Sequence, residues 1–422
     1  MAFVGRGSKQ QSIEAFGDHV SSGKAAFFAQ IGLEFVPGQR QGVYLWDVEG
    51  EKRLINCHCN GGVFNLGHRH PSLLDTLRRA LDELDIGNGH LISEQRAALG
   101  RRLAELAPGD LPYTVFAAGG GEAIDFALKL ARAHTKRPGI LSAQGGYHGH
   151  TGLALAAGDP QYRDPFGPMP PGFAQVPFGD LGAMAAQIGD DTAAVILETV
   201  PATLGMPIAP AGYFAELRAL CDHHGALLIV DEVQSGLGRT GRMWAIEHYV
   251  SVPDILVTGK GLSGGLYPIA ATCYREELNP FMHANPFIHI STFGGAEVGC
   301  AVALAVLDLT ASPAFLKRVN ELAERLAGGF RQLQERYPDT LVEVRQLGLM
   351  IGLVLPDESC GPLMTKLLYD EGVLAIYANN DQRVLQFLPP LIMSDIEAEE
   401  TLGALDRALV TLSQVRGWRI LH

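Results

Sequence analysis

The chain has 422 residues, of which 47% are hydrophobic and 19% charged, the composition of an ordinary globular protein with room for two or three domains. Its formal net charge of -13 argues against nucleic acid or an anionic membrane as the main partner. The six cysteines are too few and too scattered for a disulfide framework, and no run of about 18 apolar residues predicts a membrane span, so we expect a reduced, cytoplasmic protein.

Residues 1–11 lack the apolar core of a signal peptide, and the first 60 or so residues look irregular apart from two strand-like runs. Those runs are residues 42–50 and 52–56, and a glycine at their junction predicts a hairpin turn. Leucines at helical spacing then predict a helix that begins at Pro71. A second amphipathic helix is predicted over residues 94–106, before a Pro-Gly terminator.

Between residues 115 and 310, short apolar runs alternate with helix-like stretches. This alternation predicts an α/β fold in which helices cover both faces of a mostly parallel sheet. The elements after residue 310 predict a smaller α+β domain. The apolar runs are residues 113–117, 193–197, 226–230 and 255–257; helices are predicted at 212–224, 313–337 and 396–414, and further strands near 341–344 and 349–355.

Two chemically useful residues, Asp231 and Lys260, stand at the ends of successive apolar runs. A lysine between glycines just past a buried strand is partly desolvated, which lowers the pKa of its amine until it can act as a nucleophile. Because α/β sheets bind ligands at the carboxyl ends of their strands, Asp231 should face the same site. An amine and a carboxylate so placed are the pair that pyridoxal phosphate requires. Taken singly, each residue is better explained as a cap or as a surface side chain with its stem packed.

A glycine-rich turn at residues 119–121 follows an apolar run and opens a predicted helix. The backbone amides of Gly120 and Gly121 at such a helix start would bind a phosphate. A dinucleotide-binding fingerprint is the alternative, but it needs a glycine where this chain has Ile124. On its own, a glycine turn before a helix is more often a packing device.

Three short clusters contain aromatic, histidine or cysteine residues. Tyr147, in a glycine-rich loop, could stack on a planar cofactor. His148 and His150 lack a third ligand for a metal, so we interpret them as loop or packing residues and expect no metal site. The same holds for the pairs His68 with His70 and Cys57 with Cys59.

Taken together, these motifs resemble the class III aminotransferases, which are fold type I pyridoxal-phosphate enzymes. The match covers nearly the whole chain in order, and its most specific part is Asp231-Glu-Val-Gln-Ser-Gly-Leu-Gly-Arg-Thr-Gly followed by Lys260-Gly-Leu. The resemblance implies a seven-stranded, mostly parallel sheet in a large domain (66–310), a smaller α+β domain (311–422) and an N-terminal segment (1–65) that packs with the latter. It also implies a homodimer with two shared active sites.

The resemblance assigns roles to individual residues. Lys260 would form the internal aldimine with pyridoxal 5′-phosphate and then move the proton between the substrate carbon and the cofactor. Asp231 would pair with the pyridinium nitrogen. The other expected cofactor contacts are Val233 on the ring face opposite Tyr147, Gln234 at the phenolic oxygen, Gly120 and Gly121 at the phosphate together with Thr292 of the second subunit, and His148 and Glu198.

The substrate side departs from the family pattern. Many relatives have an arginine, which grips an α-carboxylate, where this chain has Gln386, three residues before Pro389. The glutamate that masks this arginine in some relatives is replaced by Thr203. Losing both members of an ion pair is coherent, because either charge alone would be stranded. The alternative is that Arg383 does the same work from a shifted position.

We therefore expect an aminotransferase that exchanges an amino group between a primary amine or amino acid and a keto acid in ping-pong fashion. Without the arginine, its acceptor could be a keto acid such as pyruvate, or its substrate could lack an α-carboxylate. An amino-acid racemase or epimerase on the same scaffold is the main alternative, since it needs no acceptor. Lys260 and Asp231 argue against a non-catalytic relative, and Ile124 argues against a dinucleotide-dependent oxidoreductase.

Overall fold

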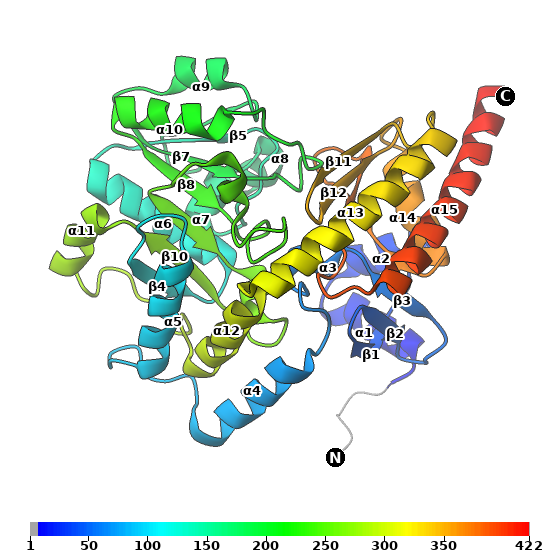
Figure 1. Cartoon of the computed structure of the whole chain (residues 1–422), viewed down its shortest axis with the longest axis horizontal. Helices are drawn as coiled ribbons and strands as arrows, with labels where there is room; N and C mark the ends of the chain where they lie inside the picture. The colour runs from blue at the N-terminus through cyan, green and yellow to red at the C-terminus, as the bar shows by residue number, and fades with distance from the viewer. Residues whose placement is uncertain (1–6, 422) are drawn as a thin grey trace.

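The computed structural model describes residues 7–421, and a seven-stranded sheet forms its larger part (Figure 1). In space the strands follow the order β4-β10-β9-β8-β7-β5-β6. All neighbours are parallel except β10, which is antiparallel to both β4 and β9, so the predicted α/β fold with a mostly parallel sheet is confirmed. The strands are β4 (Tyr113–Ala117), β5 (Gly139–Ala143), β6 (Phe173–Val176), β7 (Thr192–Glu198), β8 (Leu227–Asp231), β9 (Ile255–Thr258) and β10 (Ala270–Tyr274).

Both faces of this sheet are covered by helices. Every residue of β7 is buried, and its side chains alternate between two apolar cores. Val195 and Leu197 belong to one core, while Ala194 and Ile196 belong to the other. The first core is closed by α5 (Glu94–Leu106), α10 (Tyr213–His224) and α12 (Glu297–Thr310), and the second by α6 (Gly120–Thr135) and α7 (Gly152–Ala156).

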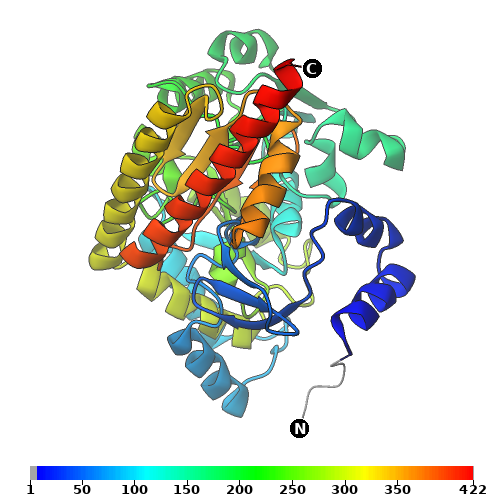
Figure 2. The same ribbon diagram turned by 90° about the vertical axis from the view of Figure 1, so that its right-hand side faces the viewer.

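The last third of the chain forms an antiparallel sheet of four strands in the order β11-β12-β15-β14. Three long helices pack on it and share one apolar core with it, as Figure 2 shows in yellow, orange and red. The strands are β11 (Glu343–Leu347), β12 (Met350–Val354), β14 (Ile376–Tyr377) and β15 (Val384–Phe387), and the helices are α13 (Pro313–Arg336), α14 (Cys360–Asp370) and α15 (Asp395–Leu421).

A third sheet joins the two ends of the chain. The N-terminal strands β1 (Pro37–Gln41), β2 (Tyr44–Asp47) and β3 (Arg53–Asn56) are antiparallel neighbours, which confirms the predicted hairpin. Its turn is held by Asp47, whose Oδ1 accepts from the backbone N–H of Glu51 at 2.9 Å. The short strand β13 (Val373–Leu374), from the last third of the chain, pairs with β3 in parallel.

The irregular start that we predicted is wrong, because two helices lie there: α1 (Lys9–His19) and α2 (Ser22–Gln30). Ser8 forms a capping box at the first and Ser21 caps the second. Neither helix has a buried residue, so no apolar stripe revealed them. Residues 1–6, part of the start expected to lack a signal peptide, lie outside the described residues.

The strand predicted near 341–344 begins two residues later than expected. The chain still turns on Tyr337 there, since the backbone carbonyl of Tyr337 accepts from the N–H groups of Thr340 and Leu341 at 3.0 and 2.9 Å. β11 therefore starts only at Glu343. Remaining helices include α4 (Pro71–Glu83), which confirms the prediction at Pro71, α3 (Cys59–Gly62), α8 (Pro160–Arg163), α9 (Leu181–Gln187) and α11 (Asn279–Ala284).

No single helix within residues 7–421 has the length and apolar composition of a membrane span. Only α12 and α13 taken together reach that composition, across a bend of 66°. More than half of α12 is buried in the protein core, which accounts for its apolar sequence.

Candidate active site

Three charged side chains meet at the carboxyl ends of β7, β8 and β9. Glu198 ends β7 and is paired in register with Asp231, which ends β8. Asp231 lies in turn opposite Val257 of β9. β9 ends at Thr258, and Lys260 follows after Gly259. The structure thus brings Asp231 and Lys260 to one edge of the sheet, as the strand-end argument predicted.

Lys260 has a backbone φ of 40°, a left-handed conformation that is uncommon for a residue with a side chain. Its Nζ donates a hydrogen bond to Oε1 of Gln234 at 2.5 Å. Burial lowers the pKa of the amine, while the nearby carboxyls of Glu198 and Asp231 oppose that shift without cancelling it. An amine with a lowered pKa spends more time in its neutral, nucleophilic form.

The carboxyl of Asp231 is buried and held at both oxygens. Oδ1 accepts from the backbone N–H of Val233 at 3.0 Å, and Oδ2 lies 2.8 Å from Nδ1 of His148. Burial alone would lower the pKa of His148, but the hydrogen bond and charge of Asp231, with the charge of Glu198, raise it above its ordinary value. The 2.8 Å contact with His148 therefore fixes the orientation of the Asp231 carboxyl.

Glu198 links this edge to the loop that carries Tyr147. Its Oε1 accepts from the backbone N–H of Tyr147 at 2.8 Å, and burial raises its pKa to about 7. The Tyr147 side chain is 38% exposed, and its ring makes an edge contact with that of His150 at 5.1 Å between centroids. One face of the site is therefore lined by an aromatic ring on a fixed backbone.

The glycine turn lies against the same residues. A Cβ at Gly120 would come within 3.1 Å of Cγ1 of Val233, and one at Gly149 within 2.8 Å of Cα of Gly121. No side chain caps the N-terminus of α6, and the space beside Gly119 is open. Because the first N–H groups of a helix have no partner within the helix, this end of α6 can receive an anion such as a phosphate.

Several polar atoms at this edge are buried and lack a partner within the described chain. They include Nε2 of Gln234, Nε2 of His148 and Oγ1 of Thr258. Buried polar atoms of this kind indicate a missing partner. An amine, a paired carboxyl, a free amide donor, an aromatic ring and an uncapped helix together suit an aromatic aldehyde with a phosphate group, so the residues present fit pyridoxal phosphate.

Sequence reasoning missed the segment that covers the amine. Residues Cys59, Asn60 and Gly61 all have left-handed backbone, with φ of 51°, 50° and 64°. A Cβ at Gly61 would lie 3.1 Å from Nζ of Lys260, and the left-handed φ of this residue also favours glycine. Burial and the charge of Lys260 lower the pKa of the neighbouring His58 to about 4. The Asn-Gly-Gly run just after β3 was the available signal for this turn.

Three of the predicted residues have side-chain hydrogen bonds to partners other than Lys260, Asp231 and Glu198, and a fourth is exposed. Oγ1 of Thr203 donates to the backbone carbonyl of Gly145 at 3.0 Å, at the start of the Tyr147 loop. Gln386 is buried in β15 and opposite Gly352, which a carbonyl of the loop after β7 approaches closely. The exposed Arg383 is bound through two nitrogens to Asp381. Thr292 is exposed, in the segment between α11 and α12.

Known proteins resemble this chain in both sequence and fold. The sequence profile of the class III aminotransferases matches residues 30–409. An uncharacterized aminotransferase of Archaeoglobus fulgidus is 58% identical over 416 residues, which cover 99% of this chain and 98% of that protein.

Two solved structures extend this likeness to three dimensions. The ornithine aminotransferase of Toxoplasma gondii ME49 is 25% identical, with a TM-score of 0.89 over 97% of this chain and 96% of that one. An (S)-enantioselective omega-transaminase of Thermomicrobium roseum is 28% identical, with a TM-score of 0.86 over 96% and 98% of the two chains. The chain belongs to the class III aminotransferase family and is a pyridoxal-phosphate-dependent aminotransferase of fold type I.

Proposed function

We propose that Lys260 is the residue that holds the cofactor covalently and moves the substrate proton. The convergence of Lys260, Asp231 and the glycine turn on one sheet edge supports this assignment. The bound cofactor supplies an electron sink that eases loss of a proton from the substrate carbon next to the amino group. The lowered pKa of the Lys260 amine suits it both to bond the cofactor aldehyde and, once released, to accept that proton.

The surrounding residues orient the ring. Asp231 would keep a proton on the nitrogen of a bound ring, and the 2.8 Å contact with His148 holds Asp231 in place. Val233 and Tyr147 would contact a bound ring from opposite sides, and Nε2 of Gln234, which has no partner within residues 7–421, would donate to its phenolic oxygen. The first amides of α6, at Gly120 and Gly121, would bind the phosphate, because this turn has only glycines and no hydroxyl of its own.

The substrate side supports a departure from the glutamate and 2-oxoglutarate pair. Gln386 has no charge to hold a carboxylate, and its Nε2 makes only a long contact, 3.5 Å, with the backbone carbonyl of Tyr377. Arg383 could bind a substrate carboxylate only by giving up Asp381, to which it donates at 2.9 and 3.0 Å. We propose that the enzyme takes an amine or amino acid that it recognises without a cation at position 386.

A panel of amino donors, followed by absorbance at the cofactor, tests this proposal. Amines that convert the cofactor to its pyridoxamine form are donors, and the keto acids that reverse the change are acceptors. We expect glutamate to be a poor donor and 2-oxoglutarate a poor acceptor, with at least one other pair turning over faster. Glutamate reacting as fast as the best donor would contradict the substrate assignment and leave the cofactor roles intact.

We also propose that the enzyme works as a homodimer. Seven large apolar side chains are exposed on two segments, residues 86–92 and 287–293, which meet where His90 stacks on Phe287 at 5.9 Å. An exposed apolar group of this size suits a second copy of the chain. Thr292 lies within it, so it would reach the partner's site. The seven are Ile86, Leu91, Ile92, Phe287, Ile288, Ile290 and Phe293.

Ile290→Asp tests the dimer, because it places a charge in the middle of that surface. Analytical ultracentrifugation should show a dimer for the wild type and a monomer for the variant, and the monomer should bind the cofactor more weakly. Val250→Asp is the control, since Val250 is 91% exposed and lies outside the two segments. A monomeric wild type that binds the cofactor fully would contradict the proposal.

Racemisation or epimerisation is the second candidate, because Gln386 leaves open a reaction that needs no acceptor. Incubating one enantiomer of an amino acid in deuterated water separates the two functions. Transamination gives a keto acid in step with the aminated cofactor. Mirror-image product labelled with deuterium, without any keto acid, would favour the second candidate.

We place the enzyme in the cytoplasm. Its six cysteines are all buried and form no disulfide, which suits a reducing compartment. Cell fractionation with an antibody against the chain checks this, and recovery outside the cytoplasmic fraction would contradict it.

A further inference from the structure

The loop between β14 and β15 of the smaller C-terminal sheet reaches across to the large sheet through one residue, the half-buried Asn380. Its backbone N–H donates to the carbonyl of Thr203 at 2.9 Å. Its side chain donates through Nδ2 to the carbonyl of Gly145, also at 2.9 Å. Its Oδ1 accepts from Nε2 of Gln161 and from the hydroxyl of Tyr162, each at 2.9 Å. One small-domain residue thus satisfies four polar groups of the large domain.

The Gly145 peptide is the point where these contacts meet. Its carbonyl accepts from both Asn380 and Thr203, and its N–H donates to Oδ1 of Asp159 at 2.8 Å. Gly145 has a φ of 75°, and a Cβ there would come within 2.4 Å of Cδ1 of Leu204. The backbone two residues before Tyr147 is therefore held on three sides.

A chain of aromatic rings connects Asn380 to Tyr147 by a second route. The ring of Tyr162, whose hydroxyl binds Asn380, lies 5.6 Å from the ring of His150. His150 makes the edge contact with Tyr147 at 5.1 Å. Backbone and side chain of Tyr147 are thus both connected to the same small-domain asparagine.

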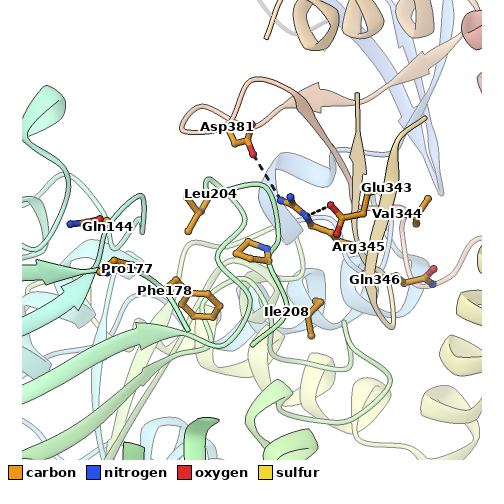
Figure 3. Close-up of a pocket in the computed structure, with 11 residues that line it drawn as sticks. Gln144, Pro177, Phe178, Leu204, Ile208, Glu343, Val344, Arg345, Gln346 and Asp381 are labelled. Carbon is orange, nitrogen blue, oxygen red and sulfur yellow. Dashed lines mark hydrogen bonds and ion pairs between the residues drawn. The ribbon is translucent and has the colours of Figure 1, made fainter. Parts of the chain in front are cut away.

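Ion pairs hold the rest of the loop in place. Asp381, next to Asn380, binds Arg383 and lies 3.9 Å from a guanidinium nitrogen of Arg345 on β11. Arg345 also donates to the carbonyl of Gly205 at 2.9 Å. Figure 3 shows Arg345 between Asp381 and Glu343, beside a cleft of about 700 Å³ that is lined by β11 and by loops that follow strands of the large sheet. The two parts of the molecule are thus joined along this seam by charges at Arg345 and by neutral hydrogen bonds at Asn380.

We propose that Asn380 is a positioning residue, which fixes the loop of Tyr147 and the loop of Thr203 against one another and so makes the wall of the active site depend on the small domain. The proposal rests on the proposed function only where it assigns Tyr147 to a face of the cofactor ring. Asn380 touches none of the reacting groups. Its effect on the reaction passes through the position of Tyr147.

Hydrogen exchange of the cofactor-free protein tests the structural half of this proposal. In Asn380→Ala, the amides of residues 145–150 should exchange about 10-fold faster or more, because one hydrogen bond to Gly145 and the support of Tyr162 are lost. Asn380→Asp keeps an acceptor for Tyr162 but loses the donor to Gly145, so it separates the two routes. Asn379→Ala is the matched control, since Asn379 is the exposed neighbour on the same loop.

Measurements on the enzyme with bound cofactor test the effect of Asn380 on the reaction. Asn380→Ala should weaken cofactor binding and raise KM by about 5–10-fold, with a smaller fall in kcat, and it should change the visible circular dichroism of the bound cofactor. Tyr162→Phe keeps the ring contact with His150 and loses the hydroxyl bond, so it should give a smaller change. Combining it with Asn380→Ala should add nothing if both act through one contact.

Three results would overturn the proposal. They are wild-type exchange at residues 145–150 in Asn380→Ala, an equal effect of Asn379→Ala, and faster exchange spread evenly over the small domain, which would indicate general destabilisation. A wild-type protein that binds no pyridoxal phosphate would contradict the proposed function. Hydrogen exchange at residues 145–150 would still decide the role of Asn380.

Discussion

The proposed cofactor side and the proposed substrate side of this site differ in how their charges are used. At the ends of β8 and β9, Lys260, Asp231 and His148 face one another across a buried edge, where some donors have no partner within residues 7–421. On the substrate side, Gln386 and Thr203 are neutral, and Arg383 is bound to its neighbour Asp381. Under the proposed assignments, the cofactor side fixes the reaction, and the substrate side selects substrates by shape and neutral contacts.

The difference also has a structural origin. The cofactor side is built from strand ends and the turns that directly follow them, which the large sheet holds rigidly. The substrate side is built where the loop after β7 meets the C-terminal sheet, across Gly352 and Asn380. Its geometry depends on how the two parts of the chain sit together.

Lys260→Ala should produce the largest effect, and it tests the cofactor side. We expect a loss of about 10⁴-fold or more in kcat, because the variant lacks the group that bonds the cofactor and moves the proton. Thermal unfolding should show an unchanged or slightly raised Tm, since a desolvated amine is removed. Lys317→Ala, an exposed lysine on α13, is the control. Full activity in Lys260→Ala would refute the assignment.

Asp231→Asn should cost less, about 10²–10³-fold in kcat, because the carboxylate is lost and the shape is kept. Without Asp231, burial should take the pKa of His148 below its ordinary value instead of above it. Histidine NMR of the cofactor-free protein measures that shift. An unchanged His148 pKa would show that Asp231 does not stabilise the protonated form of His148.

Gln386→Arg sharpens the comparison from the substrate side. A guanidinium there should raise kcat/KM for glutamate by about 10–100-fold, the scale of a charge-assisted hydrogen bond, while lowering the Tm because the cation is buried without a partner. Adding Thr203→Glu should restore the Tm. In contrast, Arg383→Gln should leave glutamate activity nearly unchanged. If Arg383→Gln abolished carboxylate recognition, Arg383 would be the gripping cation.

Glu198→Gln tests the electrostatics of the shared edge through pH. The folded chain holds the Glu198 proton more tightly than the ordinary pKa of 4.5, up to about 7. The contribution of the protonated Glu198 carboxyl to the free energy of unfolding is therefore fully present below pH 4.5, and it is lost as the pH rises through about 7. Urea midpoints of the cofactor-free protein should fall over that window, by on the order of 1–3 kcal/mol in unfolding free energy. Glu198→Gln should flatten the fall, and the exposed Glu321→Gln should not.

The placement of Asp231 and Lys260 could be predicted from sequence because it depends on local features: an apolar run, its end and one crossover. The contact of His148 with Asp231 could not, since the two residues are joined only by the folded sheet. The reversed direction of β10 was also hidden, because a strand buried on both faces reads the same in either direction. For the left-handed turn over Lys260, the only signal in the sequence was a run of Asn and Gly. The hydrogen bonds of Asn380 could not be predicted, because they depend on two loops that meet only in the folded protein.

Reduction of the loaded enzyme with borohydride, followed by peptide mass spectrometry, tests the central claim most directly. Borohydride makes the bond between the cofactor and its lysine permanent. We predict that the pyridoxyl mass is found on the peptide that contains Lys260 and on no other. The same mass on a different lysine, or on none, would contradict the account.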